Sequence, residues 1–73
     1  MMDMRAETEA KILKALAEIG GPTTAKEVAE RAGLSVYTVR KRMRDLINAG
    51  LVTKSGRKYV ITEEGKKKVE SGG

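Results

Sequence analysis

Apolar residues in the first half of the chain recur at intervals of three and four, which is the spacing of one face of an α-helix. In the first segment these residues are Ile12, Leu13, Leu16 and Ile19. We therefore expect a helix from about Asp3, whose carboxylate suits an N-cap, to Ile19. The run Gly20-Gly21-Pro22 then ends this helix.

Two shorter helices follow, and each begins with a capping residue. The run Thr24-Ala25-Lys26-Glu27 has the pattern of a capping box, which predicts a second helix to about Ala32. Gly33 occupies the position where many helices end with a left-handed residue. Ser35 is the N-cap candidate of a third helix, predicted from Val36 to about Ala49. Its apolar stripe consists of Val36, Val39, Met43, Leu46 and Ile47.

After Gly50 the spacing changes to that of β-strands. Leu51-Val52-Thr53 and Tyr59-Val60-Ile61-Thr62 are rich in β-branched residues and bracket the run Lys54-Ser55-Gly56-Arg57-Lys58. This pattern predicts a hairpin with glycine in its turn and with Tyr59 facing the core. Thr62 can cap a last short helix from Glu63 to about Glu70, and residues 71–73 are expected to be a disordered tail.

Together these segments predict a mainly helical α+β fold, with a three-helix bundle, a two-stranded β-hairpin and a short last helix. The chain has 73 residues, of which 40% are hydrophobic, so we expect one small domain over residues 1–73. That size excludes a deep pocket for a large cofactor. No apolar run approaches the ~18 residues of a membrane-spanning helix, and no secretory signal is present, so we expect a cytoplasmic protein without a membrane partner.

The composition also limits the chemistry of the chain. Cys and His are both absent, which removes the usual ligands of transition metals and the commonest general base. The candidate nucleophiles Ser35 and Ser55 have local roles as cap and turn residues. We therefore expect no enzymatic activity, no cofactor and no metal site. The absence of Gln, together with abundant Lys, Arg and Glu, is typical of proteins from thermophilic organisms.

Positive charge is concentrated in the second half of the chain. The net charge is +5, but residues 1–33 carry five basic and six acidic side chains, whereas residues 34–73 carry ten basic and four acidic ones. Seven of those basic residues lie between Arg40 and Lys58, against the single acid Asp45. Such asymmetry is typical of a protein that binds a polyanion, although excess charge can also serve solubility alone.

The order of the elements and two stretches of sequence resemble a winged helix-turn-helix domain. The first stretch, Thr24 to Val52, runs Thr-Ala-Lys-Glu-Val-Ala-Glu-Arg-Ala-Gly-Leu-Ser and then Val-Tyr-Thr-Val-Arg-Lys-Arg-Met-Arg-Asp-Leu-Ile-Asn-Ala-Gly-Leu-Val. The second, Tyr-Val-Ile-Thr-Glu-Glu-Gly from Tyr59 to Gly65, is similar to the strand-to-helix exit of MarR-like and related prokaryotic, archaeal-type transcriptional regulators. The resemblance implies a homodimer that binds duplex DNA and controls transcription. In contrast to larger regulators, we expect neither a separate ligand-sensing domain nor a small-molecule effector.

The resemblance also assigns residues 35–49 as a recognition helix, whose N-terminal part reads base edges in the major groove. A wheel of 100° per residue separates the polar face of this helix from its apolar stripe. On the polar face, the candidates for base contacts are Tyr37, Thr38 and Lys41. The candidates for phosphate contacts are Ser35, with the amides that it caps, and Arg40, Arg42 and Arg44.

Several of these residues also have purely structural interpretations. Tyr37 can pack on a helix flank, and Thr38 can simply complete the cap. Arg42 can form an ion pair with Asp45, three residues further on, worth only ~0.2–0.5 kcal/mol. These alternatives leave the DNA contacts of the third helix as a hypothesis.

Residues 54–58 are the expected basic wing, with Lys54, Arg57 and Lys58 around its tip. An arginine at such a tip can enter a narrow minor groove. A lysine on an exposed strand edge also prevents sheet-to-sheet aggregation, and both roles can hold for one residue.

We therefore predict a sequence-specific, duplex-DNA-binding transcriptional regulator. A non-specific architectural DNA-binding protein fits the same charges. A protein-interaction module requires an exposed apolar patch, and an RNA-binding protein requires several exposed aromatic residues. The homodimer is expected to form through the first helix, with Met4 and Ala10, or through the last helix.

Overall fold

The computed structural model describes residues 4–72, which form four helices and a two-stranded antiparallel sheet. The helices are α1 (Met4–Ile19), α2 (Ala25–Ala32), α3 (Val36–Asn48) and α4 (Glu63–Gly72). The strands are β1 (Val52–Ser55) and β2 (Lys58–Ile61). The predicted fold class, a helical bundle followed by a hairpin and a short helix, is confirmed. The expected N-cap, Asp3, lies outside the described residues.

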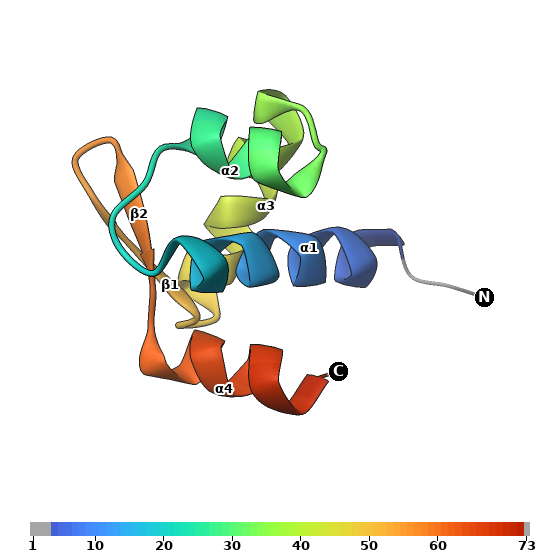
Figure 1. Cartoon of the computed structure of the whole chain (residues 1–73), viewed down its shortest axis with the longest axis vertical. Helices are drawn as coiled ribbons and strands as arrows, with labels where there is room; N and C mark the ends of the chain where they lie inside the picture. Colours follow the sequence, from blue (N-terminus) through green and yellow to red (C-terminus); the bar gives the residue numbers. More distant parts are fainter. Residues whose placement is uncertain (1–3, 73) are drawn as a thin grey trace.

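Helix α1 crosses the middle of the molecule, with α2 and α4 on opposite sides of it (Figure 1). Helix α3 packs against both α1 and α2 and lies behind them in this view. The hairpin stands at the end of the molecule where α1 finishes, away from the described N- and C-terminal ends. This arrangement leaves α3 and the hairpin side by side, because β1 also packs on α3.

One hydrophobic core joins α1, α2, α3 and the hairpin. Each helix contributes residues at the spacing that the sequence predicts, since positions three and four apart share a face. The largest fully buried apolar side chains are Ile12, Leu16, Met43, Leu46, Val28, Val39 and Val52. Truncation of one such aliphatic residue to alanine costs ~2–5 kcal/mol, so this core carries much of the stability of the fold.

The predicted caps of α2 and α3 are confirmed. The Thr24 hydroxyl accepts a bond from the Glu27 backbone N–H at 3.3 Å, and the Glu27 carboxylate accepts one from the Thr24 N–H at 3.4 Å. Gly33 ends α2 with φ of 71°, a left-handed conformation that suits a residue without Cβ. Ser35 caps α3 through its hydroxyl.

The hairpin has a shorter loop than the sequence predicts. Lys54 pairs with Tyr59 and Ser55 with Lys58, so only Gly56 and Arg57 connect the strands. Gly56 has φ of 62° at the first loop position, where a type II′ turn also has its glycine. The ladder therefore extends almost to the tip and holds Lys54 and Lys58 on its strands.

A backbone pairing outside the hairpin was not expected from the sequence. Thr23 donates to the Tyr59 carbonyl at 3.0 Å, and the Tyr59 N–H donates to the Thr23 carbonyl at 2.7 Å. This isolated bridge adds the loop before α2 to the edge of β2. It places the start of α2 beside the hairpin.

Helix α4 begins with the predicted cap and ends later than predicted. The Gly65 N–H donates to the Thr62 hydroxyl at 3.1 Å, and that hydroxyl donates to the Gly50 carbonyl at 2.8 Å. The expectation of a tail from residue 71 is wrong for residues 71 and 72, because they continue the helix. The Ser71 hydroxyl donates to the Lys67 carbonyl at 2.9 Å within this turn. Residue 73 lies outside the described residues.

Candidate nucleic-acid interface

Ser35 and Thr38 bond to each other at the start of α3. The Thr38 N–H donates to the Ser35 hydroxyl oxygen at 3.1 Å, and the Ser35 hydroxyl donates to the Thr38 hydroxyl oxygen at 2.8 Å. This geometry confirms the local capping interpretation of Thr38. Its own hydroxyl proton and methyl group are not used by these bonds, so its base contact stays a prediction.

Tyr37 and Lys41 lie on the outer surface of α3. Tyr37 is 74% exposed, which does not fit the alternative of a ring packed on a helix flank. Lys41 follows one turn later and is also exposed. Both side chains are therefore available to a ligand that approaches α3 from outside, and their base contacts stay a prediction.

The structure brings four of the predicted cationic residues together in one groove between α3 and the hairpin. Arg40 and Arg44 come from α3, and Lys54 and Arg57 come from the hairpin. This α3–hairpin groove has a volume of about 650 Å³. It is lined by Thr24, Ala25, Lys26, Arg40, Met43, Arg44, Ile47, Asn48, Lys54, Arg57 and Tyr59.

The α3–hairpin groove has a cationic rim and no acidic lining residue. Tyr59 is 7% exposed, which confirms its predicted place in the core. The Lys54 ammonium lies 5.6 Å from the centroid of the Tyr59 ring, close enough for a cation–π contact. That contact holds Lys54 against β2 at the side of the groove.

Arg42 differs from its neighbours on α3. Its side chain is only 11% exposed, and its guanidinium lies 3.4 Å from the Asp45 carboxylate. The ion-pair interpretation of Arg42 is thus confirmed, and Arg42 does not line the groove. Lys58 is exposed on β2 and lies outside the groove lining as well.

Sequence reasoning missed Lys26, which also lines the groove. It is the second residue of α2, and the Thr23–Tyr59 bridge carries this end of the helix to the hairpin. The capping box predicts where Lys26 stands on α2, but only a contact between distant segments shows which surface it joins.

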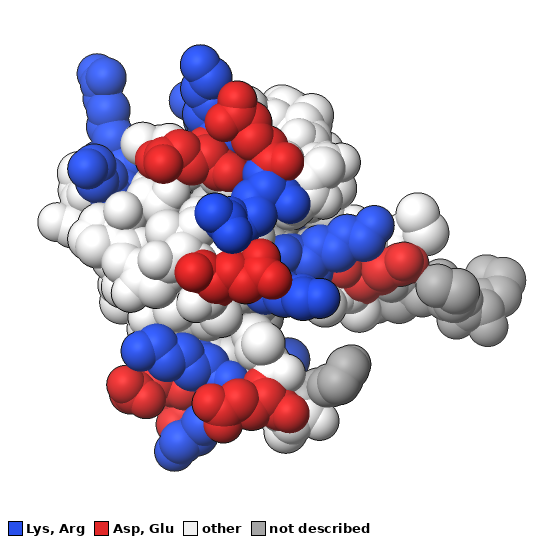
Figure 2. Space-filling model, viewed as in Figure 1, with Lys and Arg blue, Asp and Glu red and all other residues white. Residues whose placement is uncertain are grey.

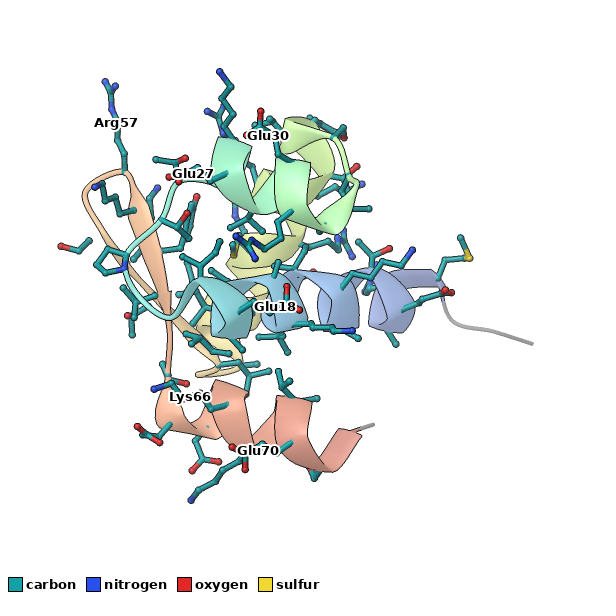
Figure 3. The ribbon with its side chains drawn as sticks, in the orientation of Figure 1. Glu18, Glu27, Glu30, Arg57, Lys66 and Glu70 are labelled. Carbon is teal, nitrogen blue, oxygen red and sulfur yellow. The ribbon has the colours of Figure 1, made fainter. Side chains whose placement is uncertain are left out.

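The acidic residues of α2 lie outside the groove. Glu18, Glu27 and Glu30 line a separate hollow with Ile19 and Arg31, and Figure 3 shows the three glutamates on α1 and α2 while Arg57 projects from the hairpin tip. Arg31 pairs with Glu18 at 3.7 Å. Figure 2 shows basic and acidic side chains mixed over α1, α2 and α4, unlike the acid-free lining of the groove.

The carboxylate of Glu27 has a pKa below its ordinary value. The main cause is the hydrogen bond from the Thr24 backbone N–H, and the Thr24 hydroxyl, 3.2 Å from the carboxylate, adds to it. Hydrogen bonds to the charged form stabilise it. Glu27 is therefore a helix cap that stays ionised, and it does not have the raised pKa of a general acid.

Residues 4–72 contain neither a metal-binding cluster of side chains nor a membrane-spanning helix. No group of three or more acidic residues is arranged to hold a metal ion in this part of the chain. None of its helices combines the length and apolar character that a membrane crossing requires.

One family model covers most of the chain. Residues 5–53 match the family model described as winged helix-turn-helix DNA-binding. The chain is 34% identical over 71 residues to the protein MJ0558 of Methanocaldococcus jannaschii, covering 96% of this chain and 27% of that protein.

Solved structures show the same fold. The crystal structure of Pseudomonas aeruginosa HmgR superposes with a TM-score of 0.78 and 30% identity, over 85% of this chain and 26% of that one. A protein of Pseudomonas aeruginosa PA01, described as a transcriptional regulator, gives a TM-score of 0.81 at 20% identity, over 94% of this chain and 50% of that one. The chain thus spans between about a quarter and a half of these proteins.

Proposed function

Since the chain belongs to the winged helix-turn-helix DNA-binding family, we propose that it binds duplex DNA through α3 and the β1–β2 hairpin and acts as a transcriptional regulator. The observation that supports this most strongly is the α3–hairpin groove, where cations from separate elements converge without an acid among the lining residues. A polyanion is the ligand that such a surface favours.

In this proposal α3 lies in the major groove, which is wide enough to admit a helix. The outer residues Tyr37, Thr38 and Lys41 face the base edges. A lysine there can donate to guanine, and a threonine methyl can contact a thymine methyl. Arg40 and Arg44 on the flank, with the amides capped by Ser35, bind phosphates and set the register. Sequence specificity then comes from the few outer residues of the first turns.

The hairpin supplies the second set of contacts through Lys54, Arg57 and Lys58. About six phosphate contacts in all imply a slope of log K against log salt near −5. A neutral protein-binding module would show little such slope. Salt dependence therefore separates DNA binding from a protein-interaction function.

A homodimer is part of the proposal. Met4 is 71% exposed at the start of α1, and an apolar groove of about 290 Å³ lies between α1 and α4. That groove is lined by Ala6, Glu9, Ala10, Leu13, Lys14, Leu46, Leu51, Lys68 and Val69. A two-fold axis beside α1 would place the Met4 side chain of each copy in the groove of the other and set Glu9 against the partner copy's lysines. Light scattering at micromolar concentration tests this, and a monomer for both wild type and Met4→Asp contradicts the interface.

The experiment that tests the function is selection of binding sites from a random duplex pool, followed by gel-shift titration of the selected site. A regulator should bind that site at least ~10³-fold more tightly than random duplex. Equal affinity for all sequences would indicate an architectural DNA-binding protein instead. If Lys41→Glu and Arg57→Glu leave duplex affinity unchanged, the proposed interface is wrong.

A further inference from the structure

We propose that the α3–hairpin groove holds the phosphodiester backbone of one DNA strand, and that Lys26 of α2 is a phosphate-binding residue of this groove. The inference rests on the proposed function and refines it, because it assigns a role to a helix outside the recognition element. It also assigns Arg57 to the phosphate backbone and not to the minor groove.

The cations of the groove come from three elements that face one another. Lys26 lies on α2, Arg40 and Arg44 on α3, and Lys54 and Arg57 on the hairpin. A recognition helix seated in the major groove has a phosphate backbone running along its side. The hairpin packs beside α3, so the backbone on that side passes between the two elements and meets cations on both walls.

Ion pairing distinguishes the cations of the groove from cations elsewhere on the surface. The paired cations among residues 4–72 include Arg31, Arg42, Lys66 and Lys67, and all four lie outside the groove. Within the described part of the chain, no acid pairs with Lys26, Arg40, Arg44, Lys54 or Arg57. Cations left without a protein counter-charge are the ones that release counterions when phosphates bind.

Lys26 is held at the rim by the elements around it. The capping box fixes the first turn of α2, and the Thr23–Tyr59 bridge fixes that turn against the hairpin. The next residue, Glu27, lines the separate hollow that contains Glu18 and Glu30. The surface charge therefore changes from positive to negative between two neighbouring side chains. A phosphate is therefore attracted to the Lys26 side of α2 and repelled from the Glu27 side.

The hairpin loop is too short to separate Arg57 from the groove. Only two residues connect the strands, and Arg57 lines the same wall as Lys54. A phosphate contact needs only a cation, whereas insertion into a narrow A·T minor groove favours arginine. Arg57→Lys should thus keep most of the affinity, with no change in preference for A·T-rich flanks.

The test is the salt dependence of duplex affinity for wild type, Lys26→Ala, Lys26→Gln and the control Lys11→Ala, an exposed lysine of α1 outside the groove. Loss of one phosphate contact should make the slope of log K against log salt about 0.9 less steep. The ratio of wild-type to variant affinity should therefore fall about 3.5-fold between 50 and 200 mM salt, equally for selected and random duplexes. Lys11→Ala should keep the wild-type slope.

A duplex with one neutral methylphosphonate linkage at a time locates the contact. When the neutral linkage replaces the phosphate that Lys26 contacts, Lys26→Ala should cost no further affinity, because the charge that Lys26 binds is already gone. If wild type binds duplex DNA and both Lys26 variants keep the wild-type slope of log K against log salt, the phosphate contact of Lys26 is wrong and the proposed function stands. If wild type binds no duplex, both fall. Thermal unfolding of each variant shows that it is folded.

Discussion

Thr23 and Tyr59 exchange both of their backbone hydrogen bonds, at 3.0 and 2.7 Å, although 36 positions separate them along the chain. The bridge joins the loop before α2 to β2, and it carries Thr24 and Lys26 to the edge of the groove that Lys54 and Arg57 line. The groove is thus assembled from a local capping motif and a distant strand. Its shape depends on the packing of Tyr59.

The two tyrosines should separate stability from binding. Tyr59→Ala removes a buried ring and should lower the free energy of unfolding by about 3 kcal/mol or more, as for other large aromatic residues. Tyr37→Ala should leave that free energy within about 0.5 kcal/mol, because its ring is exposed, while it weakens duplex binding. Urea unfolding and gel-shift titration measure the two effects. A large loss of stability in Tyr37→Ala would contradict its assignment as an outer residue.

Arg42 and Arg44, two residues apart, should behave differently. Arg44→Ala should make the salt slope of duplex binding about 0.9 less steep, because Arg44 lines the groove without an acid partner in residues 4–72. Arg42→Ala should lose a pair worth about 0.2–0.5 kcal/mol, together with the packing of its stem, and keep the slope. An Arg42→Ala variant with the larger change in slope would show that the assignment is reversed.

Gly65 lies too close to its neighbours for a side chain of any size. A Cβ there would overlap the Leu51 carbonyl oxygen and the Ile61 side chain, so Gly65→Ala should destabilise the fold by about 1–3 kcal/mol. Gly21→Ala is the matched control, because nothing lies near its Cβ and its φ is not positive. That variant should be neutral or up to about 1 kcal/mol more stable. Thermal unfolding of both variants decides, and equal melting temperatures would contradict the close packing of α4.

The capping carboxylate of Glu27 should make part of the stability depend on pH. Its folded-state pKa lies below the unfolded value, so its contribution is present above an unfolded pKa of about 4.3 and is lost as pH falls through the folded pKa. Glu27→Gln should therefore be less stable than wild type at neutral pH, and the difference should shrink on acidification below about pH 4. Urea unfolding from pH 7 to pH 2 measures it. Glu30→Gln, for which no capping bond is expected, serves as control; a constant difference for Glu27→Gln would show that another interaction dominates.

The local features of this protein were predictable because they depend on neighbouring residues. The Thr24–Glu27 box, the Ser35 cap and the left-handed Gly33 each follow from a short run of sequence. The sequence predicts the end of α4 too early, since Ser71 and Gly72 have weak helix propensity but still continue the last turn. Termini are the least constrained part of a helix.

The sequence alone determined the order of elements, their caps, the hydrophobic face of each helix and the excess of positive charge after residue 34. Periodicity and capping act over a few residues, and charge is a matter of counting. Only the tertiary structure decided that Arg40 and Arg44 line a groove beside the hairpin, and that Lys26 joins them there. That arrangement depends on where β2 meets the loop before α2. These two segments are far apart in the chain, and their pairing leaves no periodic pattern in the sequence of either segment.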